Sequence, residues 1–273
     1  MTINCKGQIV DLRTPKVMGI LNLTPDSFYD GGKFRSASAI LRQTEKMLSH
    51  GAKFIDVGGY SSRPGADDVS ESEELARVIT AITLLVKTFP DILISVDTFR
   101  SNVAKKSIEA GAALINDISA GRRDKSMLKV ISELSVPYIM MHSKGTPKTM
   151  QSLNQYADLI KDILLYFSER IEEARSLGIV DLIIDPGFGF AKSIKQNFEL
   201  LSKLELLQSA ELPILAGISR KSMIYKSLDT TSEMALNGTT VLNTIALRKG
   251  VHILRVHDVK EAVECIELTS LLE

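Results

Sequence analysis

The sequence predicts one α/β domain with the (β/α)8 architecture of a TIM barrel, and three observations carry this prediction. Short apolar runs alternate with longer amphipathic stretches, with eight of each along the chain. The apolar runs end abruptly in polar or Gly-rich segments, which is typical of buried parallel strands. The 273 residues match the ~250 residues of such a barrel, and no linker divides the range 1–273. An open doubly wound sheet, which usually has fewer strands, is the weaker alternative.

The first core stretch sets the pattern for the other strands. Residues 1–15 are of mixed composition, and we expect a short hairpin that caps the closed end of the barrel. Val17–Leu21 is an apolar run that ends at Asn22, and the turn former Thr24-Pro25-Asp26-Ser27 lies in the loop that follows. The predicted strands, in order, are Val17–Leu21, Lys53–Val57, Ile92–Val96, Ala113–Ile115, Pro137–Met141, Asp181–Ile184, Pro213–Ala216 and His252–Leu254.

Amphipathic stretches follow the strands, and capping residues mark several of their ends. Ser36 is the expected N-cap of the first helix, and Ser70–Glu73 has the sequence of a capping box. Gly111, Gly178 and Gly250 stand where helices should stop. The predicted helices are Ser36–His50, Ser70–Thr88, Asn102–Ala110, Lys125–Leu134, Tyr156–Ser176, Gln196–Leu207, Glu233–Arg248 and Lys260–Leu271.

The composition excludes several classes of function. Lys plus Arg equals Asp plus Glu at 33 each, so no net charge favours a nucleic-acid or membrane surface. The start of the chain lacks the features of a signal peptide, and no apolar run approaches the ~18 residues of a membrane span. Cys5 and Cys265 have no nearby His partners, which argues against a metal cluster. We therefore expect a cytoplasmic enzyme without nucleic-acid or membrane partners.

Polar residues stand at the end of nearly every predicted strand. In a TIM barrel the carboxyl ends of the strands meet at one rim, where the active site lies. A single Asp or Asn after a strand is usually a helix cap or a turn former. That interpretation does not explain polar groups at so many strand ends. The set comprises Asn22, Asp56, Asp97, Asn116, Asp117, His142, Asp185, Lys221, Arg255 and His257.

The chemistry of this ring indicates the kind of ligand. Carboxylates and amides such as Asp97, Asn116 and Asp185 suit a flat heterocycle with a guanidine-like edge. The cations Lys221 and Arg255, with His257, suit phosphate oxygens. Asn22 offers a neutral oxygen for a hard cation such as Mg²⁺ that holds a diphosphate.

The glycine-rich segments are less specific. The GFGF sequence at Gly187–Phe190 resembles a nucleotide-binding fingerprint only weakly, because the third glycine is missing. Phe188 and Phe190 suit the wall of a flat-ring pocket, and packing is an equal alternative for at least one of them. A turn alone does not explain the arginine at position 63, directly before Pro64.

Eight motifs at these strand ends, in order, give the chain a full-length resemblance to the dihydropteroate synthase family. They are GILNLTPDSF (Gly19–Phe28), DVGGYSSRPGA (Asp56–Ala66), SVDTFR (Ser95–Arg100), INDI (Ile115–Ile118), MMHSKGTPKTMQ (Met140–Gln151), DPGFGF (Asp185–Phe190), GISRKSM (Gly217–Met223) and RVHDV (Arg255–Val259).

The resemblance implies an alkyl-transfer reaction in folate biosynthesis. The family joins p-aminobenzoate to (7,8-dihydropterin-6-yl)methyl diphosphate and releases diphosphate, with Mg²⁺ as cofactor. Its chemistry looks dissociative: the bond to diphosphate breaks, and the amine attacks the resulting carbocation. The loops Leu23–Lys33 and Tyr60–Val69 would then exclude water. A homodimer through the last helices is implied as well.

The resemblance also implies roles for individual residues. Asp97, Asn116, Asp185, Phe190 and Lys221 would contact the pterin. Asn22, Ser62, Arg255 and His257 would bind the diphosphate, with Asn22 also on the metal. Phe28, Ser62, Arg63, Pro64, Lys221 and Ser222 would shape the p-aminobenzoate site, with Ser222 opening a helix whose N-terminus suits a carboxylate. The catalytic set would be Asn22, Asp97, Lys221, Arg255 and His257.

Three residues depart from the family's usual pattern, and two rival functions remain. The family often has Thr at Ser62, Glu at Tyr60 and Met at Ser143. A methyltetrahydrofolate-dependent methyltransferase barrel would share the pterin contacts but would not need the SRKS segment or the NLTPDSF loop. A non-catalytic pterin-binding paralogue would be expected to lose some of the catalytic set, which is complete here.

Overall fold

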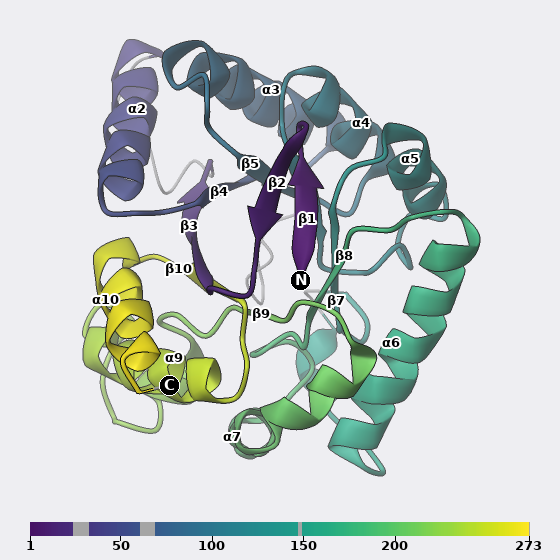
Figure 1. Cartoon of the computed structure of the whole chain (residues 1–273), viewed down its shortest axis with the longest axis vertical. Coiled ribbons are helices and arrows are strands. Elements are labelled where there is room, and N and C mark those ends of the chain that lie inside the picture. The colour runs from purple at the N-terminus through teal and green to yellow at the C-terminus, as the bar shows by residue number, and fades with distance from the viewer. Residues whose placement is uncertain (24–32, 61–68, 147–148, 273) are drawn as a thin grey trace.

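Eight parallel strands surrounded by helices form the nearly closed barrel that the sequence predicts (Figure 1). The structure is a computed structural model that describes the chain except residues 24–32, 61–68, 147–148 and 273. The strands are β3 (Lys16–Asn22), β4 (Phe54–Gly58), β5 (Ile94–Asp97), β6 (Leu114–Asp117), β7 (Tyr138–Met141), β8 (Leu182–Asp185), β9 (Leu215–Ala216) and β10 (Ile253–Val256).

The strand order is the one expected for a TIM barrel. The hydrogen-bonded sequence of neighbours runs β8-β7-β6-β5-β4-β3-β10-β9, and every pair is parallel. A single bridge between Ile184 and Ile214 joins the two ends of this order. The backbone N–H of Ile184 also donates to the carbonyl of Pro213 at 2.9 Å. The seam between β8 and β9 is therefore the narrowest connection in the barrel.

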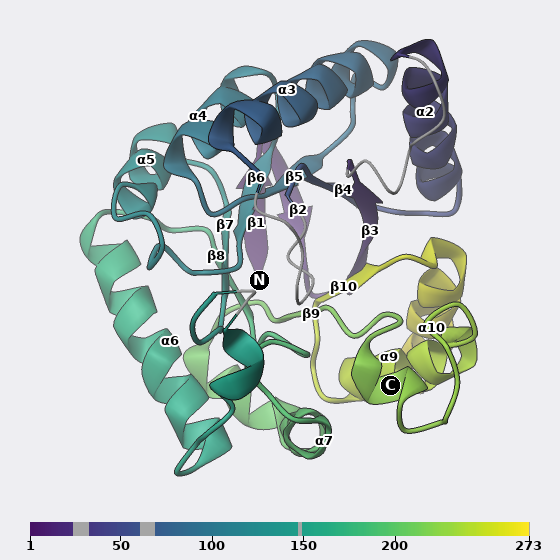
Figure 2. The same ribbon diagram turned by 180° about the vertical axis from the view of Figure 1, so that it is seen from behind.

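The helices form an outer ring around the strands (Figures 1 and 2). Ser70 caps its helix as predicted, because its side chain accepts from the backbone N–H of Glu73. The first helix begins at Lys33, so the prediction of an N-cap at Ser36 is wrong: that residue lies inside the first turn. The helices are α2 (Lys33–Ser49), α3 (Glu71–Thr88), α4 (Ser101–Glu109), α5 (Met127–Leu134), α6 (Leu159–Ser176), α7 (Ile194–Ser202), α8 (Ser222–Tyr225), α9 (Leu236–Arg248) and α10 (Val259–Ser270), with 3-10 turns Met150–Ser152 and Leu204–Ala210.

A hairpin of β1 (Thr2–Cys5) and β2 (Gln8–Asp11) covers one end of the barrel, as Figure 1 shows. Its inward-facing residues join a cluster of buried apolar side chains from the amino-terminal parts of the barrel strands. Burial of this much apolar surface stabilises the fold and closes that end to solvent. The cluster contains Ile3, Cys5, Val10, Leu12, Met18, Phe54, Leu93, Ala113, Leu114, Ile139, Ile183, Leu215 and Ile253.

The strand register brings polar residues into one row at the opposite end. Asn22 pairs with Gly58, Gly58 with Asp97, and Asp97 with Asn116. Paired residues on neighbouring parallel strands present their side chains on the same face of the sheet. The row lies at the carboxyl ends of four strands, where the site was predicted. Within the described residues, no helix combines the length and apolar composition needed to cross a membrane.

Candidate active site

Arg255 lies at the centre of the polar end of the barrel. From β10 its Nε donates to Asp56 Oδ2 at 2.6 Å, and its Nη2 donates to Asp97 Oδ2 at 3.0 Å. Asn116 Nδ2 donates to the same oxygen of Asp56 at 3.2 Å. The structure thus joins predicted site residues from three strands: Asn116 (β6) and Arg255 (β10) donate to Asp56 on β4, and Asp97 (β5) is held by Arg255.

Burial changes the ionisation of this cluster. Desolvation raises the pKa of Asp97 to about 7, although the Arg255 guanidinium opposes the shift and the Asp56 carboxylate adds to it. For Arg255, burial disfavours the charged form, but Asp56 and Asp97 outweigh burial and raise its pKa above the usual value. Arg255 therefore remains a cation at neutral pH, whereas Asp97 titrates near it.

Lys221 and Asp185 form a second part of the same site. Lys221 Nζ donates to the carbonyl of Phe188 and lies 4.8 Å from the centroid of the Phe190 ring. Burial lowers the pKa of Lys221 to about 8, against the attraction of Asp185. Asp185 Oδ1 accepts from the backbone N–H of Gly187 at 2.8 Å, and burial raises the pKa of this carboxyl. Phe190 is half-buried and its ring lies against the Lys221 ammonium, which fits a role in the wall of a pocket. Phe188 is fully buried and is a packing residue.

A buried lysine that the sequence did not single out holds the DPGFGF loop in place. Lys192 Nζ donates to the carbonyls of Gly187 at 3.0 Å and Phe190 at 3.1 Å. It also lies 3.0 Å from His142 Nδ1, and burial lowers the pKa of Lys192 to about 7. His142 thus supports this loop from the end of β7. Its own pKa is lowered well below the usual value, by burial first and by Lys192 second.

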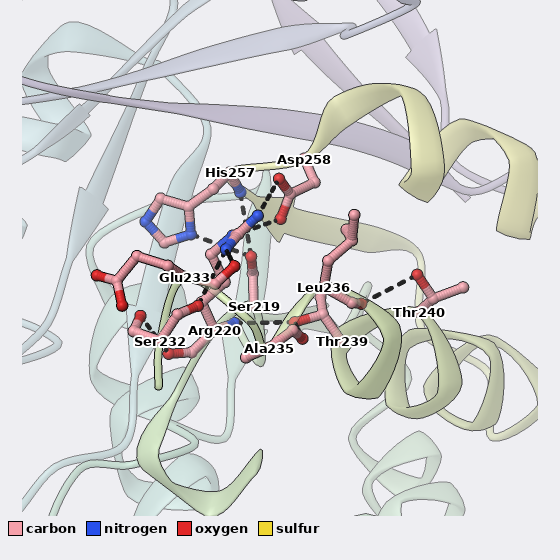
Figure 3. A network of polar contacts seen from close by, with 10 residues as sticks. All are labelled: Ser219, Arg220, Ser232, Glu233, Ala235, Leu236, Thr239, Thr240, His257 and Asp258. Carbon is pink, nitrogen blue, oxygen red and sulfur yellow. Dashed lines mark hydrogen bonds and ion pairs between the residues drawn. The ribbon is translucent and has the colours of Figure 1, made fainter. Parts of the chain in front are cut away.

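A network of polar contacts joins the GISRKS and RVHDV motifs (Figure 3). Arg220 donates to both oxygens of Asp258 at 2.8 Å, and its backbone N–H donates to Thr239 Oγ1 at 3.0 Å. Ser219 Oγ lies 3.0 Å from His257 Nδ1 and accepts from the His257 backbone N–H at 3.2 Å. These contacts fix His257 relative to Lys221, the residue that follows Arg220.

Arg220 adopts a left-handed backbone with φ of 54°, which is unfavourable for a residue with a side chain. Its Nη1 offsets part of that strain by donating to the carbonyls of Ser232 and Glu233 at 3.0 and 2.5 Å. Sequence reasoning missed Ser219 and Arg220 as support for the site. Their place between the strand-end glycine and Lys221 in GISRKS was the available signal.

Asn22 stands at the end of β3, in the row with Gly58 and Asp97. A Cβ on Gly58 would lie 3.8 Å from Asn22 Oδ1, so the glycine leaves open space in front of the amide oxygen. Within the described part of the chain, no group of three or more His, Cys, Asp or Glu residues could hold a metal. Asn22 thus fits a Mg²⁺ ion only where a phosphate ligand and water supply most of the coordination.

The predicted p-aminobenzoate residues fall in two groups. Ser222 is the first residue of α8, directly after Lys221, as predicted. The positions of Phe28, Ser62, Arg63 and Pro64 lie outside the residues that the structure describes. Tyr60 packs edge-on against Phe99 with 5.3 Å between ring centroids.

Comparisons with known proteins agree with this geometry. Residues 18–257 match the family model of pterin binding enzymes. A dihydropteroate synthase of Escherichia coli K12 is 42% identical over 272 residues, which cover 99% of this chain and 96% of the relative. The crystal structure of Yersinia pestis dihydropteroate synthase with a sulfonamide drug superposes with a TM-score of 0.93 at 42% identity, covering 100% of this chain and 99% of that one. The Xanthomonas albilineans synthase with 4-aminobenzoic acid gives 0.92 at 37% identity, over 99% and 97%.

The barrel, its polar rim and these matches define a pterin-binding enzyme. Within that class the relatives are transferases of folate biosynthesis, and the chain belongs to the dihydropteroate synthase family.

Proposed function

We propose that the chain condenses p-aminobenzoate with (7,8-dihydropterin-6-yl)methyl diphosphate to give 7,8-dihydropteroate and diphosphate. The observation that carries the proposal is the cluster at the rim of the barrel in which Arg255 donates to Asp56 and Asp97 and Asn116 donates to Asp56. Hydrogen-bond acceptors for a heterocycle and a cation for its leaving group thus lie side by side.

The acidic part of the site suits the pterin. Asp97, Asn116 and Asp185 offer short, rigid polar groups to a guanidine-like edge, and Phe190 offers an aromatic face. The two carboxylates would also favour positive charge on the ring as the bond to diphosphate breaks. Lys221, between Asp185 and the Phe190 ring, would complete this pocket.

The basic part suits the departing diphosphate. Arg255 uses Nε and one Nη2 hydrogen for Asp56 and Asp97, so its remaining N–H groups would serve phosphate oxygens. His257, Asn22 and Ser62 would bind the same group. Mg²⁺ held at Asn22 would supply charge neutralisation on the diphosphate.

The p-aminobenzoate would lie against Lys221 and Ser222, and the family resemblance adds Phe28, Ser62, Arg63 and Pro64 to this part of the site. Solved relatives support this assignment: one is described with 4-aminobenzoic acid and another with a sulfonamide drug. We expect sulfonamides to compete with p-aminobenzoate in this chain. An enzyme that turns over normally but ignores sulfonamides would contradict the assignment of this part of the site.

We further propose that the protein is a cytoplasmic homodimer. Exposed apolar side chains gather on the last two helices, where Val241 and Ile245 of α9 are 50% and 39% exposed and Leu268 of α10 is 67% exposed. Burial of such side chains between two copies would stabilise a dimer. Sedimentation velocity tests this, and a monomer at micromolar concentration would contradict it.

The experiment that tests the function is incubation with the pterin diphosphate, Mg²⁺ and p-aminobenzoate, with dihydropteroate and diphosphate assayed separately. Equal amounts of both products are expected. Methyl transfer from methyltetrahydrofolate without dihydropteroate formation would favour the methyltransferase alternative, and pterin binding without either reaction would favour a non-catalytic paralogue.

A further inference from the structure

Asp56 is a buried carboxylate in the predicted ring of strand-end residues, and the family resemblance assigns it no role. Its side chain is 0% exposed, and its Oδ2 accepts from Arg255 Nε at 2.6 Å and from Asn116 Nδ2 at 3.2 Å. Its other oxygen, Oδ1, is buried without a hydrogen-bond partner in the described residues. One atom on β4 therefore holds side chains from β6 and β10.

This contact fixes the direction of the Asn116 amide. A carboxylate only accepts hydrogen bonds, so Asn116 must turn its NH2 group toward Asp56. The amide oxygen then points away from Asp56. No described residue donates a hydrogen bond to this oxygen, and Asn116, at 3% exposed, stands at the open end of the barrel, so the oxygen is left to accept from a ligand. Asn116 consequently faces a ligand as an acceptor, as Asp97 and Asp185 do when ionised.

We propose that Asp56 is a positioning residue for ligand specificity: by holding the Asn116 amide in one orientation, it makes this wall of the pocket accept hydrogen bonds from the exocyclic amino group of a pterin. The inference rests on the proposed function and specifies how its pterin site selects a ligand. An analogue with a carbonyl oxygen in place of that amino group would place one hydrogen-bond acceptor against another, the Asn116 amide oxygen. The site would therefore bind this analogue poorly.

The contact between Arg255 and Asp56 allows charge and orientation to be separated. In Asp56→Asn, the atom that faces Arg255 Nε must be the amide oxygen, because Nε only donates. That oxygen still accepts from Asn116, so the variant loses the charge but keeps the orientation. The leucine of Asp56→Leu has a shape similar to that of aspartate but no hydrogen-bond acceptor. The Asn116 amide can then rotate and exchange the positions of its oxygen and its NH2 group.

The chain offers a matched control on the adjacent strand. Ser95 is the register partner of Asp56, is 0% exposed, and has a buried hydroxyl without a partner among the described residues. Ser95→Ala therefore disturbs the same layer of the barrel without touching Arg255 or Asn116.

The experiment compares the affinities of 6-hydroxymethylpterin and its 2-oxo analogue by titration calorimetry, without p-aminobenzoate. We expect Asp56→Leu to reduce the preference for the amino compound about tenfold, as the loss of one oriented hydrogen bond predicts. Asp56→Asn and Ser95→Ala should keep the wild-type preference. A general loss of packing would lower both affinities and leave their ratio unchanged.

Two results would overturn the inference: an unchanged ratio in folded Asp56→Leu, or an equal fall in Asp56→Asn. If Asp56→Leu does not fold, the same ratio is measured in Asp56→Ala, whose methyl side chain also removes the acceptor. Failure of the wild type to form dihydropteroate would overturn the proposed function instead, and the affinity ratio is measured without that reaction.

Discussion

The two ends of the barrel are built from the same strands and have opposite chemistry. On four strands an apolar residue of the closed-end cluster is followed two positions later by a polar residue of the open end. Because side chains two positions apart on a strand share a face, both point into the barrel. The pairs are Phe54 and Asp56, Leu114 and Asn116, Ile183 and Asp185, and Ile253 and Arg255.

The comparison shows how stability and recognition are divided along each strand. The closed end is filled by apolar side chains at most 4% exposed, and their burial stabilises the fold. At the open end, buried charged groups carry a desolvation cost that only their mutual contacts offset. Changes at the closed end should therefore reduce stability alone, whereas changes at the open end should reduce activity as well.

The largest effect is expected from Arg255→Ala. It removes the cation assigned to the diphosphate and leaves Asp56 and Asp97 buried without it. We expect kcat/KM to fall by at least about 10³-fold and the free energy of unfolding to fall by about 3–5 kcal/mol. Direct assay of diphosphate release and urea denaturation measure the two effects. Near-normal release would refute the assignment.

A change at the closed end should separate the two effects. Leu12 is 0% exposed in the apolar cluster, and we expect Leu12→Ala to cost about 2–5 kcal/mol of unfolding free energy. Its kcat/KM per folded molecule should stay at the wild-type value. A loss of activity in the folded variant would show that the two ends are not independent.

Between these extremes lies the network of Figure 3, in which Ser219 contacts His257 and Arg220 contacts Asp258. Asp258→Asn weakens the paired contact with Arg220, and we expect a loss of about 1.5–3 kcal/mol, as for other charged hydrogen bonds. Because Lys221 and His257 then shift relative to each other, kcat should fall up to about 10²-fold. An unchanged kcat with reduced stability would assign the network to folding alone.

The open end should also respond to pH. In the proposed function Asp97 acts as a carboxylate and Lys221 as a cation; burial raises the pKa of Asp97 to about 7 and lowers the pKa of Lys221 to about 8. We expect kcat/KM to rise with pH through about 7 and to fall above about 8. Lys221→Arg should remove the alkaline fall, because a guanidinium stays charged. A fall that persists in this variant would exclude Lys221 as its cause.

The raised pKa of Asp97 has a consequence for stability as well. Between its ordinary value of 3.8 and about 7, the folded chain holds a proton that the unfolded chain has lost. The contribution of Asp97 to stability is therefore present below 3.8 and is lost as pH rises to about 7. We expect Asp97→Asn to remove this part of the pH dependence in denaturation experiments.

The smallest effect is expected from Ile9→Ala, which is the matched control for Leu12→Ala. Both residues belong to the amino-terminal segment, but Ile9 is 65% exposed. Its truncation should change stability by less than about 0.5 kcal/mol. A loss comparable to that of Leu12→Ala would mean that the outer face of the hairpin is buried by another surface.

The sequence predicted the barrel and most of the rim because both follow from short-range patterns. Apolar runs that end in polar residues identify the strands, and parallel strands then bring Asp97, Asn116 and Arg255 to one end. The pairing of Arg255 with Asp56 was not predictable in this way. It depends on strand register and on side-chain conformations across the barrel, which no local pattern specifies.

Other differences have similar causes. Most strand ends shift by one or two residues, whereas α2 begins earlier than predicted, α6 and α9 begin later, and α7 ends well before Leu207, because local propensity sets element ends only loosely. The sequence did not predict a buried role for Lys192, because a lysine is usually exposed. Only the fold shows that Lys192 donates to two carbonyls of its own loop.

Asp56 and Arg255 are 199 positions apart, and this separation bears on how the protein is made. During translation β4 leaves the ribosome long before β10. Until the last strand arrives, the Asp56 carboxylate lacks its guanidinium partner, so enclosing it is costly. If the barrel of a nascent chain closed before β10 was made, it would bury the unpaired Asp56 carboxylate. The desolvation cost of that burial favours closure of the barrel only after the final strand is available. Ligand recognition is thus among the last properties that the newly made chain acquires.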